Sequence, residues 1–144
     1  MGTTSRASAT WEGLVRSGKG HFEAGSGAFR GDYSFATRFE GANGTNPEEL
    51  LAASHAACFS MALSVGLEQA GTPATRISTT AHCTVDKVGD GFKVTTLRLD
   101  VRGVVPGANA AAFQSAAEAA KVGCPISGAI AGNVKVHMEA RLEH

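Results

Sequence analysis

The stretch from Asn46 to Gly71, NPEELLAASHAACFSMALSVGLEQAG, constrains the fold of this chain most strongly, because it predicts one long helix. Asn46 is a good N-cap residue, and Pro47 suits the first helical position. Glu49 follows Asn46 by three residues, as in a capping box. Gly71 and Pro73 are typical of the end of a helix. The sequence therefore predicts a helix bounded by Asn46 and Gly71.

This helix is apolar or small on nearly every face, whereas a surface helix carries a polar stripe. We expect it to lie in the core or against a partner chain. Cys58 lies near its middle. The apolar and small positions are Leu50, Leu51, Ala52, Ala53, Ala56, Ala57, Phe59, Met61, Ala62, Leu63, Val65 and Leu67.

Length and composition indicate a single domain spanning residues 1–144 with a substantial core, since 43% of the 144 residues are hydrophobic and 18% are charged. A net charge of zero argues against nucleic acid or an acidic membrane surface as partner. The N-terminus lacks the apolar core of a signal peptide, and His55, Ser60 and Ser64 interrupt the apolar helix, so we expect a cytoplasmic protein with no membrane span. Residues 142–144 are typical of an expression-tag remnant and carry no weight.

The other elements follow from alternating apolar residues, turn residues and caps. Strands are predicted at residues 7–16, 19–23, 33–39, 76–88, 92–105 and 134–142, a helix at 110–122, and a short helical segment from Pro125 to about Ala131 with Cys124 as its N-cap. Their order indicates an α+β domain with curved antiparallel sheets around two helices.

Three cysteines, an odd number, do not form a disulfide framework. No CxxC or HxxxH spacing predicts a metal site. If the two main helices pack together, Cys58 and Cys124 could come close, and in a reducing compartment such a pair is typical of a redox couple. The alternative is that Cys58 is only a small buried hydrophobic residue. We interpret Cys83, on a predicted strand, as structural.

Local physics makes Cys124 the easier thiolate, because a helix N-terminus lowers the pKa of a thiol. Cys58 lies mid-helix, where burial raises the pKa, so it needs a neighbouring cation. Arg38, just before the loop that leads into the long helix, is the candidate, because a guanidinium stays charged when buried. The alternative for Arg38 is a solvated strand residue.

Glu48 precedes Cys58 by ten residues, which places them about 15 Å apart along the helix axis and about 80° apart around it. Any role of Glu48 at a thiol must therefore concern another chain across a symmetric interface. Alternatively, its charge only favours the helix N-terminus. His55 precedes Cys58 by three residues, so a Cys–His nucleophile is conceivable, although packed histidines are the commoner case.

Two segments carry a family resemblance: RFEGANGTNPEELLAASHAACFSMAL (Arg38 to Leu63) and KVGCPIS (Lys121 to Ser127). Together they closely resemble the OsmC/Ohr family, and within it the osmotically induced OsmC branch. WEG, SGKG and the DKVGDGF hairpin are also similar to that branch, so that the resemblance covers essentially the whole chain.

The resemblance implies an OsmC-like fold and an intertwined homodimer with two active sites at the interface. It implies that Cys58 is the peroxidatic nucleophile and Cys124 the resolving cysteine. Arg38 would stabilise the thiolate, and Glu48 would orient Arg38, across the dimer by the geometric argument above. In the Ohr branch the arginine comes from an earlier strand, so Arg16 is the alternative to Arg38.

The implied activity is reduction of organic hydroperoxides, with a Cys58 sulfenic acid and then a Cys58–Cys124 disulfide. An external dithiol would recycle it, with lipoyl-type and small thiols as candidates. No metal, haem, flavin or other cofactor is implied. Apolar residues near Cys58 (Leu51, Phe59, Met61 and Phe39) favour a peroxide that carries an alkyl or lipid group. The alternatives are a thiol- or sulfur-handling protein and a non-catalytic ligand-binding or structural dimer.

Overall fold

The structure is a computed structural model that describes residues 2–143; Met1 and His144 lie outside the described residues. The chain divides into two compact units, Met1–Pro47 and Glu48–His144.

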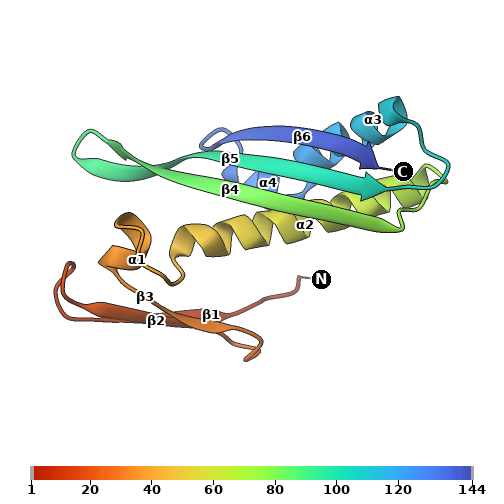
Figure 1. The fold of residues 1–144 in the computed structure, drawn as a ribbon. Coiled ribbons are helices and arrows are strands. Elements are labelled where there is room, and N and C mark those ends of the chain that lie inside the picture. Colours follow the sequence, from red (N-terminus) through yellow and green to blue (C-terminus); the bar gives the residue numbers. More distant parts are fainter. Residues whose placement is uncertain (1, 144) are drawn as a thin grey trace. The chain divides into compact units, whose positions relative to one another are not determined.

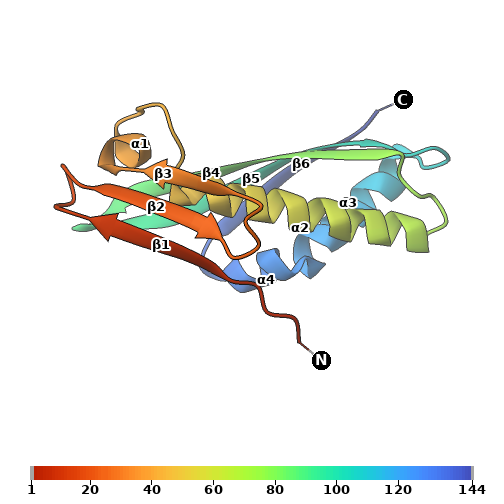
Figure 2. The same cartoon turned by 90° about the horizontal axis from the view of Figure 1, so that it is seen from below.

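The N-terminal unit is a three-stranded antiparallel sheet followed by a short helix (Figures 1 and 2). Its elements are β1 (Ala7–Glu12), β2 (Lys19–Ala24), β3 (Arg30–Tyr33) and α1 (Phe35–Phe39). The strands lie in the order β1-β2-β3. The predicted second strand is confirmed. The first strand ends at Glu12 rather than at residue 16, because Gly13 turns the chain with a φ of +92°.

The predicted strand at 33–39 is wrong, because only Tyr33 belongs to a strand and Phe35–Phe39 is helical. Ser34 caps this helix: the Thr37 amide donates to Ser34 Oγ, and the Ser34 amide donates to Thr37 Oγ1. The Phe35 and Phe39 rings, one helical turn apart, lie 5.1 Å from each other. This capping box outweighs the alternation of apolar residues that suggested a strand, and it places Arg38 on a helix.

The C-terminal unit packs three helices against a second sheet of three strands. Figures 1 and 2 together show α2, α3 and α4 on the same face of this sheet. The elements are α2 (Pro47–Gln69), β4 (Arg76–Val88), β5 (Gly91–Val104), α3 (Ala110–Gly123), α4 (Pro125–Ile130) and β6 (Lys135–Glu143). The predicted existence and type of all six elements are confirmed. Leu142 and Glu143 of the suspected tag remnant belong to β6, and His144 lies outside the described residues.

Helix α2 begins at Pro47 and ends at Gln69, within the predicted bounds. At its C-terminal end Gly71 has a φ of +84°, its amide donates to the Glu68 carbonyl, and the Thr72 amide donates to the Leu67 carbonyl. These two bonds form a Schellman motif, for which glycine is the favoured residue. By length and composition alone α2 could cross a membrane, but the core helix of a soluble protein meets the same criterion.

The second sheet is mixed, which corrects the expectation of antiparallel sheets. β4 and β5 form an antiparallel hairpin, whereas β6 runs parallel to β5, with Thr96 opposite Lys135. A parallel neighbour requires a long crossover connection, and helices α3 and α4 provide it.

The core of the C-terminal unit lies between the helices and the inner face of this sheet. It includes Phe59, Leu63 and Leu67 of α2 against Leu97 and Leu99 of β5, and each of these five side chains is at most 1% exposed. The opposite face of the sheet carries ion pairs such as Arg98 with Asp100 and Glu139. One face of the sheet is therefore apolar and covered, and the other is charged.

Candidate active site

Cys58 and Cys124 are neighbours in the C-terminal unit, one on α2 and the other at the N-cap of α4. The two thiols interact with each other, and both are free. Cys58 is half-buried, and Cys124 is 1% exposed. The prediction that packing of the helices could bring these two cysteines close is confirmed.

The two thiols differ in acidity. Burial raises the pKa of Cys58, and the interaction with Cys124 raises it further. Burial also acts to raise the pKa of Cys124, but the interactions with Cys58 and with the backbone and hydroxyl groups of Ser127 outweigh it, so the Cys124 pKa is lowered. These directions agree with the sequence argument. A neighbouring cation would act in the opposite direction and lower the Cys58 pKa.

His55 does not pair with Cys58 but packs as a buried histidine. Its Nε2 lies 2.7 Å from Ser127 Oγ, both residues are buried, and Nδ1 has no hydrogen-bond partner. Burial lowers the pKa of His55, so the ring is neutral. Sequence reasoning missed Ser127, although its position three residues after the N-cap Cys124 was a usable signal.

Glu48 is buried in the first turn of α2, only 7% exposed. The pKa of Cys83 on β4 is raised by burial and by the negative charge of Glu48. Cys83 is a partly buried residue packed against the core and therefore has an acidic neighbour that the sequence did not reveal. Burial, with the charge of Glu48 added to it, favours the protonated thiol of Cys83, which agrees with its interpretation as structural.

Arg38 and Arg16, the two candidate arginines, belong to the N-terminal unit. The Arg38 guanidinium lies 5.0 Å from the centre of the Phe39 ring, and the Arg16 guanidinium lies 4.5 Å from that of Phe35 and 3.6 Å from Glu40. A hollow of about 280 Å³ in this unit is lined largely by aromatic residues and includes Arg38 but not Arg16. Its lining residues are Trp11, Val15, Tyr33, Ser34, Phe35, Arg38 and Phe39.

The residues expected to form an apolar surround for Cys58 occupy different environments. Phe59 is fully buried in the core, and Leu51 packs against the core. Met61 is 73% exposed in the single chain. Phe39 belongs to α1 of the N-terminal unit. The α2 residues chosen for their closeness to Cys58 in the sequence are therefore core residues, apart from Met61, which is exposed in the single chain.

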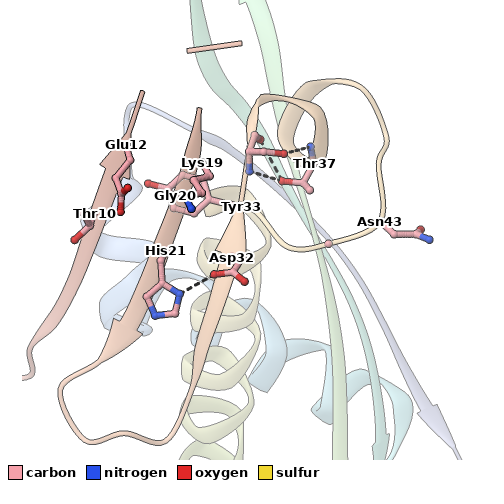
Figure 3. Close-up of a pocket in the computed structure, with 11 residues that line it drawn as sticks. Thr10, Glu12, Lys19, Gly20, His21, Asp32, Tyr33, Thr37 and Asn43 are labelled. Carbon is pink, nitrogen blue, oxygen red and sulfur yellow. Dashed lines mark hydrogen bonds and ion pairs between the residues drawn. The ribbon is translucent and has the colours of Figure 1, made fainter. Parts of the chain in front are cut away.

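A larger, polar hollow of about 620 Å³ lies on the N-terminal sheet (Figure 3). Thr10 and Glu12 of β1, Lys19 and His21 of β2 and Asp32 of β3 line one side of it. His21 Nδ1 is 2.8 Å from Asp32 Oδ1, but the Asp32 side chain is 90% exposed. This hollow contains none of the predicted site residues, and within residues 2–143 no three His, Cys, Asp or Glu side chains cluster to hold a metal ion.

The two adjacent free thiols, whose pKa values shift in opposite directions, are the candidate site. The model of the family described as OsmC-like protein matches residues 40–139, more than half of the chain. Peroxiredoxin OsmC of Escherichia coli is 44% identical over 137 residues, which cover 94% of this chain and 96% of that protein. The chain belongs to the OsmC-like family, and the predicted resemblance to its OsmC branch is confirmed.

Relatives of the Ohr type are more distant. The organic hydroperoxide resistance protein OhrB of Bacillus subtilis is 36% identical over 104 residues, covering 71% of this chain and 74% of that protein. The solved structure of an organic hydroperoxide resistance protein from Elizabethkingia anophelis has a TM-score of 0.76 at 27% identity, with 99% of this chain and 100% of that chain covered. The α+β fold is thus that of the OsmC/Ohr proteins, and the chain is a peroxidase-type oxidoreductase.

Proposed function

We propose that this enzyme reduces organic hydroperoxides to alcohols, using Cys58 as attacking thiol and Cys124 as resolving thiol. The observation that carries the proposal is the direct interaction of these two free thiols at the junction of α2 and α4. The names of the relatives, peroxiredoxin and organic hydroperoxide resistance protein, support the substrate class.

The proposed steps balance in atoms and electrons. The Cys58 thiolate attacks the distal peroxide oxygen, the O–O bond breaks, and the alkoxide takes up a proton and leaves as alcohol. The Cys124 thiolate then attacks the sulfenic sulfur of Cys58, the S–O bond breaks, and hydroxide leaves and is protonated to water, which gives the disulfide. An external reductant, either one lipoyl-type dithiol or two molecules of a small thiol, reduces the disulfide by exchange and is itself oxidised to a disulfide.

Arg38 supplies the cation that Cys58 needs, and Glu48 orients it from the partner chain of a homodimer. The spacing of Glu48 and Cys58 on one helix supports a role across two chains. The surface of α2 supports the dimer, because Met61 is 73% exposed and Val65, one turn further along the same face, is 45% exposed. Apolar side chains repeated along one helix face are typical of an interface.

The aromatic hollow that includes Arg38 is the proposed binding place for the alkyl part of the substrate. Trp11, Tyr33, Phe35 and Phe39 give it an apolar lining with one guanidinium, which suits a greasy chain attached to a polar peroxide group. In this proposal both units of residues 1–144 form one functional domain. The enzyme acts in the cytoplasm, where thiols stay reduced between turnovers.

Two cysteine variants test the assignment with an alkyl hydroperoxide as substrate. We expect Cys124→Ser to form a sulfenic acid that a dimedone-type probe labels at Cys58. We expect Cys58→Ser to consume no peroxide, and Cys83→Ser, the matched control, to keep full turnover. Full peroxide consumption by Cys58→Ser would show that Cys58 is not the attacking thiol.

A further inference from the structure

The resolving step of the proposed function needs Cys124 as a thiolate, and the structure places Ser127 and His55 beside it. Cys124 is the N-cap of α4, and Ser127 is the third residue of that helix. A side chain at this third position turns back toward the N-cap residue, as in a capping box. The Ser127 side chain interacts with Cys124 from within the same short helix.

His55 fixes the other side of the Ser127 hydroxyl. His55 and Cys58 are three residues apart on α2 and so lie on the same face of that helix, the face that meets α4. His55 Nε2 lies 2.7 Å from Ser127 Oγ, and neither residue is more than 5% exposed. The link joins side chains 72 positions apart in the chain and ties α2 to the helix that carries Cys124.

The unpartnered Nδ1 of His55 decides which way the hydrogen bond runs. A neutral imidazole carries one N–H hydrogen. Burying an N–H group without an acceptor costs more free energy than burying an unprotonated ring nitrogen beside apolar groups. Nδ1 has no partner, so the hydrogen sits on Nε2 and is donated to Ser127 Oγ. Ser127 Oγ is then the acceptor for His55, and its own hydrogen is left for the sulfur of Cys124.

We propose that His55 is a positioning residue that acts through Ser127, which in turn stabilises the Cys124 thiolate during its attack on oxidised Cys58. This inference rests on the proposed peroxidase function and adds two residues to the resolving step. Before oxidation the Cys58 thiol also interacts with Cys124, but its thiol hydrogen is gone once Cys58 is a sulfenic acid. The Ser127 hydroxyl still interacts with the Cys124 sulfur at that stage, so its effect falls on the second step.

The lowered pKa of Cys124 supports this arrangement. Burial alone acts to raise it, and the interactions that reverse the direction include the side chain of Ser127 as well as that of Cys58. The same donor also makes Cys124 the better leaving thiol when the external dithiol attacks the disulfide, because a stabilised thiolate leaves faster.

The test separates the two chemical steps by rapid quench, with a dimedone-type probe for the sulfenic acid and intact mass for the disulfide. We expect Ser127→Ala to slow disulfide formation about 10- to 100-fold, the effect of one hydrogen bond to an ionised group. The formation of sulfenic acid at Cys58 should keep its wild-type rate. His55→Leu should slow disulfide formation about 3- to 10-fold, and His55→Gln, whose amide can still donate, should restore most of it.

Ser60→Ala is the matched control, because Ser60 is a serine of α2 whose hydroxyl oxygen lies 2.7 Å from that of Thr79 on β4. It should leave both steps unchanged. Disulfide formation at the wild-type rate in Ser127→Ala would overturn the proposed role of Ser127. Disulfide formation as slow in His55→Gln as in His55→Leu would overturn the positioning role of His55. If the wild-type protein itself formed no sulfenic acid and no disulfide, the proposed function would fail instead. Ser127→Ala removes one oxygen atom and keeps the test open if His55→Leu does not fold.

Discussion

Met61→Glu tests whether the exposed face of α2 is the dimer interface that the proposed mechanism requires. Met61 is 73% exposed in the single chain, so a glutamate there should change monomer stability by no more than about 0.5 kcal/mol. In a dimer that buries this face the same change removes apolar contact area and adds a carboxylate without a partner.

The magnitude follows from the exposed area of Met61. Full burial of a methionine side chain is worth about 1.5–3 kcal/mol, so burial of the 73% still exposed is worth about 1–2 kcal/mol. A two-fold interface contains the residue twice. Loss of both contacts raises the dimer Kd about 30- to 1,000-fold, at about 1.4 kcal/mol per tenfold change. The desolvated carboxylate raises it further.

Sedimentation velocity across a dilution series measures the dimer Kd, and peroxide consumption at the same concentrations measures activity. We expect Met61→Glu to lose both together, because in the proposed mechanism each site takes Glu48 from the partner chain. Ser78→Glu, which adds the same charge on the exposed face of β4 opposite Arg102, is the control and should keep the wild-type Kd. A Met61→Glu protein with an unchanged dimer Kd would refute the interface, and a monomeric wild-type enzyme with full activity would refute the borrowed glutamate.

Three further predictions concern single residues. Arg38→Met should lower the rate of peroxide consumption at least about tenfold in stopped-flow assays. Arg16→Met loses only an exposed ion pair with Glu40, so its rate should stay within about twofold of the wild type. The reverse order of the two rates would make Arg16 the active-site arginine. Gly103→Ala should lower the free energy of unfolding in urea by about 1–3 kcal/mol, because the added Cβ would lie 2.5 Å from the buried Phe113 ring. The control is Gly91→Ala on the same strand, whose Cβ meets nothing within 4 Å and should change the free energy of unfolding by under about 0.5 kcal/mol. Burial acts to raise the pKa of Asp100, but the interactions with Arg98 and His82 outweigh it, so the pKa is lowered. The stability that this carboxylate contributes is therefore present above its ordinary pKa of 3.8 and disappears as the pH falls through the lowered value. Asp100→Asn should therefore be less stable than the wild type at neutral pH and equally stable in strong acid, and a difference that persisted in acid would contradict the charge argument.

The elements that sequence reasoning placed well are those with local signals. The caps of α2, Pro47 at its start and Gly71 after its end, are short-range features, and so is the turn between β4 and β5. The direction of β6 was missed because it depends on which strand it joins after the crossover through α3 and α4, and no local pattern encodes that choice. Phe35–Phe39 was missed because its alternating residues fit a strand, and the Ser34–Thr37 capping box was overlooked.

The site could be predicted in part. Spacing and helix physics identified Cys58 and Cys124 as a pair of unequal thiols, and the structure agrees in contact and in the direction of both pKa shifts. Ser127 was missed, although it lies three residues after Cys124. The bond between His55 and Ser127 joins residues 72 positions apart, and such a contact is set by packing rather than by sequence spacing. The environment of Cys83, beside Glu48, was hidden for the same reason.

The central claim is that Cys58 and Cys124 are a working redox couple. The most direct measurement is the intact mass and peptide map of the fully reduced wild-type protein after one equivalent of an alkyl hydroperoxide. We predict the loss of two hydrogen atoms per chain and a single cross-linked peptide pair that contains Cys58 and Cys124. An unchanged mass while the peroxide persists, or a cross-link that involves Cys83 instead, would contradict this account.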